Sequence, residues 1–315
     1  MLLLWQIFIL YKFNFQIYMK IYDCFMFFDE EMLLDLRLNV LNKYVDKFVI
    51  TEATYMHSGK SKKLTFDINK FPKFKDKIIY NVVDKQPSTL ELINKEDSNE
   101  TKGSKLINNS LKRENYQREM GNVTLNMAED EDLILINDID EIPNLDKINF
   151  NNINKKLIIF KQKIFCYKFN LQYENLIWHG SKACRKKNFI SPQCLRNVRH
   201  RKYPFWRFDI IFSNKKYNNI HYVENGGWHF TNIKSPEDLE KKFLNFLHHQ
   251  DFESSGLKLE DIKEKVKNKK ILYDLGIDQR GYKWSGKKTL TKINLSEMPG
   301  YLSINREKYS AWIEN

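Results

Sequence analysis

A pattern near the start of the chain limits the possible folds more than any other part of the sequence. A strand-length apolar run is followed by a helical pattern and then by a second strand-length apolar run. Residues 21–27, IYDCFMF, are long enough for one buried strand. Acidic residues at 29–31 suit the start of a helix, and apolar side chains then follow at helical spacing at Leu34, Leu38, Leu41 and Val45. Residues 47–52 again have the composition of a strand. Strand, helix and strand over about thirty residues form a βαβ unit, so we predict an α/β fold with a mostly parallel central sheet.

The composition allows a sizeable core and favours anionic partners. Of the 315 residues, 42% are hydrophobic, which excludes bulk disorder. Lys and Arg number 52 against 40 Asp and Glu, and the formal net charge of +12 suits phosphates, nucleotides, nucleic acid or an acidic membrane surface. The four cysteines form no C-x-x-C pair, so neither a disulfide-stapled fold nor a common zinc pattern is indicated.

The N-terminal residues 1–19 are hydrophobic but are interrupted by Lys12. The uncharged run before Lys12 is shorter than the roughly 20 residues that span a bilayer. A weak anchor, an extra edge element and translated sequence ahead of a true start at Met19 are the three interpretations, and we favour the last. We divide the rest into a main domain at 20–250 and a C-terminal extension at 251–315. A cytoplasmic or peripherally membrane-associated protein is favoured over a secreted one.

The middle of the chain alternates between strand and helix patterns. Residues 77–83 predict a strand, 85–110 a loop or lid, 115–128 a helix, and 157–169 further strands. Residues 182–207 predict a basic connection that carries aromatic side chains. Farther along, Ser235 and Pro236 suit the start of a helix whose packed face includes Leu239 and Phe243.

The sequence LILINDIDEIP places three carboxylates, Asp138, Asp140 and Glu141, directly after a buried strand. Carboxylates in such a place need water or a cation. Two oxygen ligands spaced i, i+2 at a strand end can hold a hard divalent ion, which in turn can neutralise a diphosphate. A bare D-x-D is more often a solvated acidic turn. The preceding strand, the stop at Pro143 and the positive charge elsewhere favour an anionic substrate bridged by metal.

Two other functions compete with this interpretation. Basic residues interleaved with Tyr203, Phe205 and Trp206 could track phosphates and stack bases; they are Arg185, Lys186, Lys187, Arg196, Arg199, Arg201, Lys202 and Arg207. No recognised nucleic-acid motif accompanies them, so we expect no nucleic-acid partner. A metal-dependent phosphodiesterase would also use the DIDE sequence, but it usually needs more His and Asp ligands.

Several motifs together resemble glycosyltransferase family 17, which contains the β-1,4-mannosyl-glycoprotein β-1,4-N-acetylglucosaminyltransferases. The resemblance spans about residues 20–250 and rests chiefly on DIDEIP followed by GGWHF at 226–230. The strand at 21–28, the Thr51-Glu52 strand end with HSGK at 57–60, and the Gln117-Arg118 pair add to it. It implies a GT-A-like, Rossmann-type glycosyltransferase domain at 20–250 and an inverting transfer to a glycan acceptor. The extension at 251–315 is then a candidate for the acceptor side. It also implies Mn²⁺ or Mg²⁺ as the metal and a nucleotide-sugar donor, with UDP-GlcNAc expected.

The resemblance also assigns roles to single residues. It places Asp138 and Asp140 on the metal and the diphosphate, with Glu141 beside them, and makes His229 a further metal ligand. Glu52 matches the strand end that holds the nucleoside. Arg118 is a candidate for contact with the diphosphate or with the acidic cluster, because a guanidinium pairs well with either.

An inverting transfer also needs a base near the attacking hydroxyl, normally a carboxylate. The candidates are Asp209, Glu224 and Glu141. We prefer Glu224, because it precedes the glycine turn that leads to Trp228 and His229.

Overall fold

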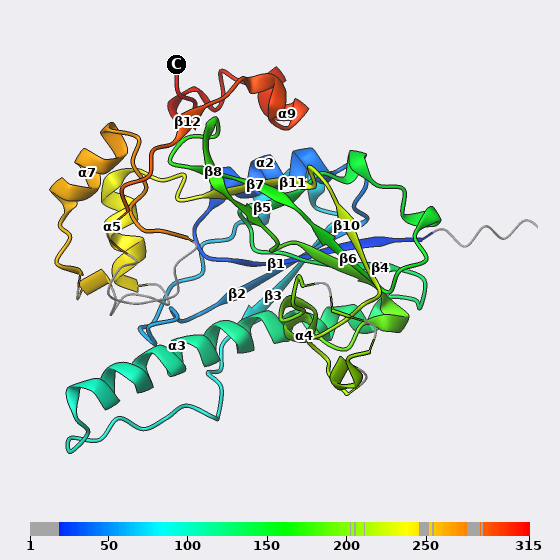
Figure 1. The fold of residues 1–315 in the computed structure, drawn as a ribbon, viewed down its shortest axis with the longest axis horizontal. Helices are drawn as coiled ribbons and strands as arrows, with labels where there is room; N and C mark the ends of the chain where they lie inside the picture. The colour runs from blue at the N-terminus through cyan, green and yellow to red at the C-terminus, as the bar shows by residue number, and fades with distance from the viewer. Residues whose placement is uncertain are drawn as a thin grey trace, which may run out of the picture.

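Two β-sheets with helices on their faces make up the protein, seen here in a computed structural model (Figure 1). The structure describes residues 19–201, 203–204, 206–210, 212–245, 252–253, 255–275, 284 and 286–315. The predicted α/β class is confirmed. Within the described residues, no helix is long and apolar enough to cross a membrane, and the four cysteines are free thiols.

The first sheet has seven strands in the order β10-β6-β9-β4-β1-β2-β3. They are β1 (Ile21–Phe27), β2 (Lys47–Ala53), β3 (Ile78–Val83), β4 (Leu133–Ile136), β6 (Leu157–Phe160), β9 (Lys182–Arg185) and β10 (Ile220–Val223). The pairings among β1, β2, β3 and β4 are parallel, as is the pairing of β10 with β6. Strand β9 is antiparallel to both of its neighbours. The predicted βαβ unit is therefore present at β1 and β2.

The second sheet has five strands in the order β12-β8-β7-β11-β5. They are β5 (Glu141–Pro143), β7 (Gln162–Cys166), β8 (Leu171–Trp178), β11 (Gly227–Thr231) and β12 (Thr291–Lys292). Only β11 and β7 pair in parallel in this sheet, and the other pairings are antiparallel. Both sheets are thus mixed. The expectation of a mostly parallel architecture needs this correction. The short connection between β7 and β8 returns the chain antiparallel to itself without a crossover helix, and β9 inserts antiparallel between β4 and β6.

Alternate side chains of the first sheet pack on opposite faces, as the period of two in a strand requires. From β1, Phe25 and Phe27 pack toward α2 (Glu31–Leu41), whereas Tyr22 and Cys24 face the other core, which includes Leu195 of α4 (Pro192–Arg196). The long helix α3 (Asn99–Met120) runs along the face opposite α2 (Figure 1). The sheet is therefore covered on both faces.

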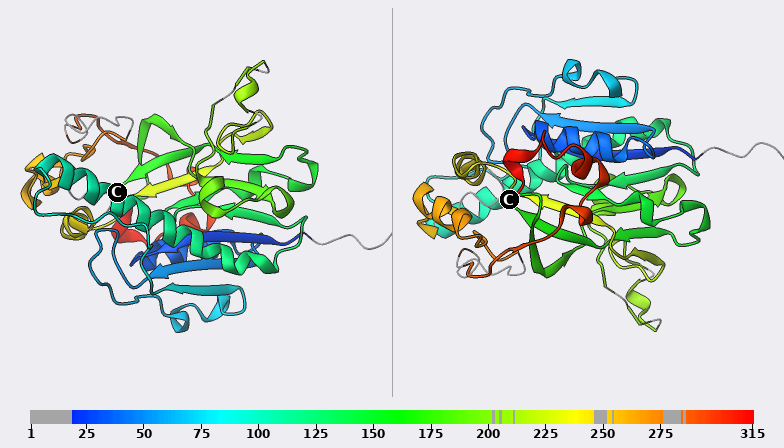
Figure 2. Two further views of the ribbon diagram at one scale, coloured as in Figure 1. Left: turned by 90° about the horizontal axis from the view of Figure 1, so that it is seen from below. Right: turned by 90° about the horizontal axis from the view of Figure 1, so that it is seen from above.

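The second sheet packs between the main core and a separate pair of helices. One face contributes side chains such as Ile164 to a cluster with α5 (Pro236–Asn245) and α7 (Leu259–Lys267). The other face contributes Phe165 and Phe230 to the core that β1 and α2 share. The C-terminal segment, with η8 (Leu295–Glu297), α9 (Gly300–Ile304) and η9 (Ser310–Trp312), lies beside α2 (Figure 2).

Two segments differ from the sequence-based expectation. Helix α3 begins at Asn99, inside the stretch predicted to be a loop, because the Ser98 side chain accepts a hydrogen bond from the Thr101 amide and so caps the helix. Helix α3 ends at Met120, and a 3₁₀ segment, η3 (Gly121–Met127), completes the stretch predicted as helix. The predicted connection at 182–207 contains β9 and α4.

The chain passes from the first sheet to the second at three neighbouring places. The links are β4 to β5, β6 to β7, and β10 to β11. Gly226, in the last link, packs so closely that a Cβ there would lie 2.6 Å from the Val223 carbonyl oxygen and 2.9 Å from the Lys161 nitrogen. The acidic turn occupies the first link, so it lies where the two sheets meet.

Candidate active site

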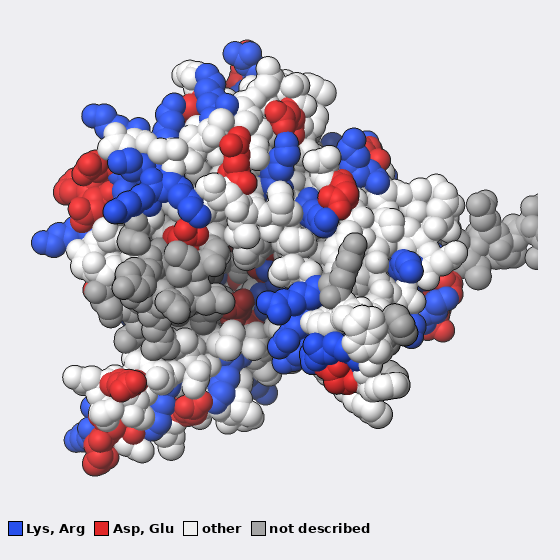
Figure 3. Space-filling view, viewed as in Figure 1, with Lys and Arg blue, Asp and Glu red and all other residues white. Residues whose placement is uncertain are grey.

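The acidic turn joins β4 to β5 at the carboxyl end of a parallel strand. Ligands in α/β sheets gather at this edge. In the space-filling view, acidic and basic side chains both reach into a hollow near the middle of the face (Figure 3). The surroundings of each carboxylate in the turn differ, and these differences decide what each can do.

A buried ion pair holds the backbone of the turn. Arg37 of α2 and Asp23 of β1 are both fully buried and form two hydrogen bonds of 2.6 and 2.8 Å. The remaining Arg37 nitrogen donates to the carbonyl of Glu141 at 2.6 Å and to that of Asp138 at 3.2 Å. Asn137 also donates to Asp23, at 2.6 Å. Strand β1 and helix α2 therefore fix the path of the acidic turn.

Asp138 is held by two guanidinium groups. Arg118 of α3 donates to one carboxylate oxygen at 3.1 Å, and Arg196 of α4 donates to the other at 2.6 Å. Burial alone would raise the pKa of Asp138, but the two arginines outweigh burial and hold its pKa below the ordinary value. Asp138 is therefore ionised and positions the guanidinium groups of Arg118 and Arg196.

Glu141 is completely buried and is paired with Arg196. The two arginine nitrogens lie 2.7 Å from its two carboxylate oxygens, and Trp178 donates to it at 2.5 Å. The Asp138 amide donates to it at 3.0 Å. Gly180 packs against this carboxylate so closely that a Cβ there would lie 1.9 Å from it. Every near neighbour of the Glu141 carboxylate therefore serves to hold it in place.

Asp140 faces His229 across the pairing of β5 with β11. Its carboxylate lies 3.5 Å from His229 Nε2. The His229 ring stacks on Trp178 with centroids 4.6 Å apart. Burial would raise the pKa of Asp140, but His229 and Lys242 of α5 lower it, so the net shift is downward. Among the described residues, Asp140 is thus the one carboxylate of the turn that pairs with an imidazole and not with an arginine.

The pair at Asp140 and His229 fits a divalent ion in part. No group of three or more His, Cys, Asp or Glu side chains in the described residues forms a complete metal site. One carboxylate and one imidazole remain, and Mg²⁺-type ions are often held by one or two protein ligands with phosphate oxygens and water. Within the described structure, His229 Nδ1 is buried and has no hydrogen-bond partner. Nε2 is the ring nitrogen that faces Asp140, so Nε2 is the atom that would share an ion with that carboxylate.

Of the other two residues predicted to bind the donor, Arg118 contacts the acidic turn and Glu52 does not contact it in the structure. Arg118 lies on the acidic cluster, as one of its two predicted roles requires. Glu52 ends β2 and is fully buried, where it accepts hydrogen bonds from Lys62, the Thr65 amide at 2.8 Å and Tyr80 at 2.8 Å. Its carboxylate anchors the loop that follows β2, and a contact with the nucleoside stays a prediction.

The two other candidate bases pair with basic side chains outside the acidic turn. Glu224 follows β10, has a side chain 69% exposed and pairs with Lys161 at 2.5 Å. Asp209 lies in the short 3₁₀ turn η7 (Phe208–Ile210) and pairs with Arg207 at 2.7 Å and Lys216 at 2.5 Å. Glu224 is therefore the more accessible carboxylate, and it stands at a crossing between the sheets.

The sequence analysis did not assign four residues to the site: Asp23, Arg37, Trp178 and Arg196, the last of which it considered only as part of the basic stretch. Two of them left a signal, because Asp23 is a carboxylate inside an apolar strand and Arg37 is a cation between Leu36 and Leu38 on a buried helix face. Such residues are rarely buried unless paired. Arg196 left none, because it lies among many other basic residues.

A sequence model of glycosyltransferase family 17 matches residues 10–191, which is more than half of the chain. The chain belongs to glycosyltransferase family 17. The predicted family is thereby confirmed, and with it the assignment as a glycosyltransferase, whose partners are a nucleotide sugar and a glycan acceptor. The matched region includes the acidic turn, Arg118 and the Glu52 strand end.

Comparisons with individual proteins add little to the family assignment. No curated protein matches the chain. Among solved structures, the crystal structure of HddC from Yersinia pseudotuberculosis is similar at 11% sequence identity, over 66% of this chain and 91% of that chain, with a TM-score of 0.31. A likeness this weak supports no inference about function.

The structure also bears on the nucleic-acid alternative. Arg196 is engaged by Asp138 and Glu141, and Arg185 donates to the carbonyls of Glu131 and Phe150 at 2.9 and 3.2 Å. Lys202 and Phe205 lie outside the described residues. Part of the basic stretch therefore serves the fold of the glycosyltransferase and is not free to follow a phosphate backbone.

Proposed function

We propose that this family 17 protein transfers N-acetylglucosamine from UDP-GlcNAc to a hydroxyl of a glycan, with inversion at the anomeric carbon. The proposal includes a GT-A-like arrangement and a divalent cation, Mn²⁺ or Mg²⁺, at the acidic turn. The single observation that carries it is the pair of Asp140 and His229, 3.5 Å apart at the carboxyl end of β4. The family supports the transfer itself, whereas the donor sugar rests on the motif resemblance alone.

In this proposal Asp140 and His229 hold the cation, with Asp138 as a further candidate ligand. When bound, the ion supplies Lewis-acid stabilisation of the negative charge on the departing diphosphate. The chain itself contributes positioning: Arg196 and Arg118 keep Asp138 ionised, and Arg37 fixes the carbonyls of the turn. Lys242, whose charge acts on Asp140, adds positive charge on the side of α5.

The donor nucleoside is proposed to lie along the ends of β1 and β2. Glu52 supports this region by fixing the loop after β2 through Thr65, Phe66 and Lys62. Its role is then indirect, because its carboxylate oxygens already accept hydrogen bonds from the protein. This arrangement accounts for a carboxylate at the strand end without requiring it to touch the donor.

Glu224 is the proposed base. A base must be able to approach the acceptor hydroxyl, so it needs an accessible carboxylate. Glu141 is enclosed by Arg196 and Trp178, and Asp209 is paired with two cations in η7. Glu224 is mostly exposed and lies five residues before His229 in the chain.

A donor screen tests the proposal. Purified protein is incubated with Mn²⁺ and a panel of nucleotide sugars, and the released nucleoside diphosphate is measured with and without chelator. We expect release that depends on the metal and is fastest with UDP-GlcNAc. Turnover that persists in excess chelator would rule out the metal, and a preference for another nucleotide sugar would correct the donor.

A matched pair of variants tests the base in the same assay. Glu224→Gln should lower kcat for transfer by at least about 100-fold, because general-base catalysis typically contributes that much. Asp209→Asn is the control, since it also removes a charged carboxylate with a lysine partner, and it should retain activity. The reverse ranking would assign the base to Asp209.

A further inference from the structure

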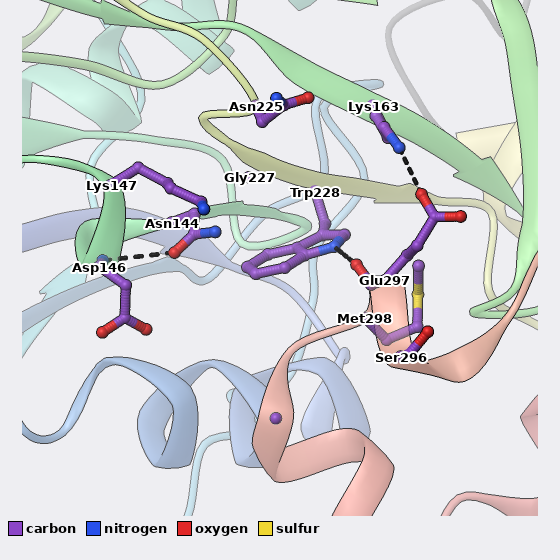
Figure 4. A pocket seen from close by; sticks show the side chains of 11 residues that line it. Asn144, Asp146, Lys147, Lys163, Asn225, Gly227, Trp228, Ser296, Glu297 and Met298 are labelled. Atoms are coloured by element: carbon purple, nitrogen blue, oxygen red, sulfur yellow. Dashed lines mark hydrogen bonds and ion pairs between the residues drawn. The ribbon is translucent and has the colours of Figure 1, made fainter.

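A groove lies on the opposite side of β11 from the proposed metal site. Its larger hollow, about 490 Å³, lies between the loop at 144–147, the turn at 225–227 and the segment 296–300 (Figure 4). A second hollow of about 250 Å³ adjoins it and extends to the end of α2. Both hollows share Asn144, Asp146, Trp228 and Gly300. Adjacent strand residues point to opposite faces, so Trp228 faces this groove while His229 faces Asp140.

The lining of the larger hollow is electrically balanced. It carries two lysines, Lys147 and Lys163, and two carboxylates, Asp146 and Glu297. Lys163 pairs with Glu297 at 2.6 Å, and Asp146 accepts a hydrogen bond from Lys43 at 2.7 Å. A nucleotide or another polyanion would need a surplus of positive charge. The groove therefore suits an uncharged ligand.

The remaining lining combines an aromatic surface with small polar groups. The Trp228 indole borders both hollows; it is 9% exposed and packs in the main core. Its nitrogen donates to the Glu297 carbonyl at 2.8 Å, which fixes the plane of the ring (Figure 4). Asn144, Asn225 and Ser296 stand around it. A sugar ring has an apolar face of C–H groups and a rim of hydroxyls. The exposed part of the indole can contact the C–H face, and the amides and the serine hydroxyl can bind the rim.

Gly300 keeps the groove open. A Cβ at this position would meet no atom within 4 Å, and the residue does not have a positive φ. Neither backbone conformation nor close packing therefore requires a glycine here. Because Gly300 lines both hollows, a large side chain at this position can reach into them.

We propose that this groove binds an uncharged oligosaccharide, as a glycan-binding site separate from the site of transfer. A volume of about 490 Å³ lies within the range of about 300–1,000 Å³ that small-molecule sites occupy. The inference rests on the proposed function in one respect, namely that the protein acts on a glycan. A site behind the sheet would hold a remote part of a long glycan and raise its effective concentration near the enzyme.

Binding of neutral disaccharides to the full chain tests this inference. The ligands are N,N′-diacetylchitobiose, β-1,4-mannobiose and cellobiose. Their binding is measured by saturation-transfer NMR and by titration calorimetry, without metal or donor. We expect at least one of them to bind with a Kd in the millimolar range or below. Gly300→Trp should weaken that binding at least about tenfold by filling the junction of the hollows. Gly300→Ala, which adds one methyl group to open space, should bind like the unmodified protein.

A second variant and two control measurements separate loss of disaccharide binding from loss of folding or of donor turnover. Ser296→Trp blocks the larger hollow from another rim and should also weaken disaccharide binding, and the melting temperature of each variant shows that it is folded. Metal-dependent release of nucleoside diphosphate should be unchanged in Gly300→Trp. Failure of all three disaccharides to bind, or equal binding by Gly300→Trp and Gly300→Ala, overturns the proposal. Because this assay contains neither metal nor donor, its failure is distinct from failure of the proposed transfer.

Discussion

At the scale of single residues, Arg196 connects two carboxylates that the sequence motif presents as equivalent. It forms a bidentate pair with the buried Glu141 and a single contact with Asp138. Asp140 is left to His229 and Lys242. In the DIDE motif, Asp138 and Glu141 thus pair with arginines, whereas Asp140 faces a histidine. The three carboxylates differ because each side chain contacts a different strand or helix.

Glu141 is expected to be structural, so Glu141→Gln should destabilise the protein. The substitution leaves Arg196 with only its single contact to Asp138, and breaking a buried ion pair by removing one partner typically costs about 3–5 kcal/mol. Chemical denaturation of the metal-free protein would measure this loss. Glu131→Gln, whose exposed carboxylate pairs with Lys187, is the control and should leave the free energy of unfolding nearly unchanged.

The opposite result would restore a catalytic role to Glu141. A base that contacts the acceptor could lose its charge without loss of stability, while turnover would fall. Unchanged unfolding with abolished transfer in Glu141→Gln would therefore contradict the structural role.

Sequence reasoning identified the carboxylates but could not rank them. Residue type and spacing indicated a cation or water at Asp138, Asp140 and Glu141. The partners that separate them come from α3, α4 and β11, at sequence distances that no local pattern reveals. By contrast, the buried pair Asp23 and Arg37 was visible as two charges inside apolar patterns, and it could have been predicted.

At the scale of elements, β9 and α4 determine where Arg196 stands. Lys182 at the start of β9 donates to the carbonyl of Arg196 and, at 2.6 Å, to that of Val198. Ser191 caps α4 by accepting a hydrogen bond from the Cys194 amide, and Glu119 of α3 accepts one from the Gln193 amide at 2.9 Å. A buried lysine thus ties the end of α4 to the sheet.

This lysine predicts a pH dependence of stability. Burial, and secondly Arg196, lower the pKa of Lys182 from 10.5 to about 7. Between these two values the unfolded chain binds more protons than the folded protein, so the contribution of Lys182 to stability rises with pH. Relative to Lys182→Met, the unmodified protein should gain stability from about pH 7 to about pH 10. Urea denaturation across this range measures the difference.

A control separates this effect from the general titration of the protein. Lys187→Met removes a half-exposed lysine from the neighbouring 3₁₀ turn, η6 (Lys186–Asn188), and should shift the stability by the same amount at each pH. If the difference in unfolding free energy between Lys182→Met and the unmodified protein were the same at every pH, burial would not perturb the pKa of Lys182.

The elements that sequence reasoning found are those with strong periodicity. The strands β1, β2, β3 and β4 and the helix α2 were predicted because apolar residues recur at the period of a strand or a helix. Helix α3 was found only in part, because its first two turns carry no apolar side chain and its start depends on the single cap Ser98. Strand β9 was missed, since its four residues carry two basic side chains and its burial depends on pairing with β4 and β6.

At the scale of the whole molecule, the C-terminal residues are part of the same core as the first βαβ unit. Met298, Leu302 and Tyr309 pack in the cluster that includes Phe25 and Leu34. A separate acceptor unit at 251–315 stays a prediction, but its last segment is joined to the main sheet by packing. The groove beside Gly300 lies along this junction, where the last segment of the chain meets η4 (Leu145–Lys147) and the end of α2.

The links between the two sheets determine where several candidate residues stand. Of the three links that lead from the first sheet to the second, the first carries the acidic turn, the second Lys161 and the third Glu224. Sequence alone could place these residues at strand ends, but it could not show that β5, β7 and β11 leave the first sheet to form a second. This topology depends on pairings between distant strands.

The central claim is that Asp140 and His229 hold the divalent cation, and titration of Mn²⁺ followed by electron paramagnetic resonance in the presence of UDP tests it most directly. Asp140→Asn and His229→Gln should each weaken Mn²⁺ binding at least about tenfold, because each removes one ligand. Their melting temperatures without metal should change little, and Asp209→Asn should bind like the unmodified protein. Equal Mn²⁺ affinity in all four proteins, or a large loss of apo stability in His229→Gln with unchanged affinity, would contradict the claim.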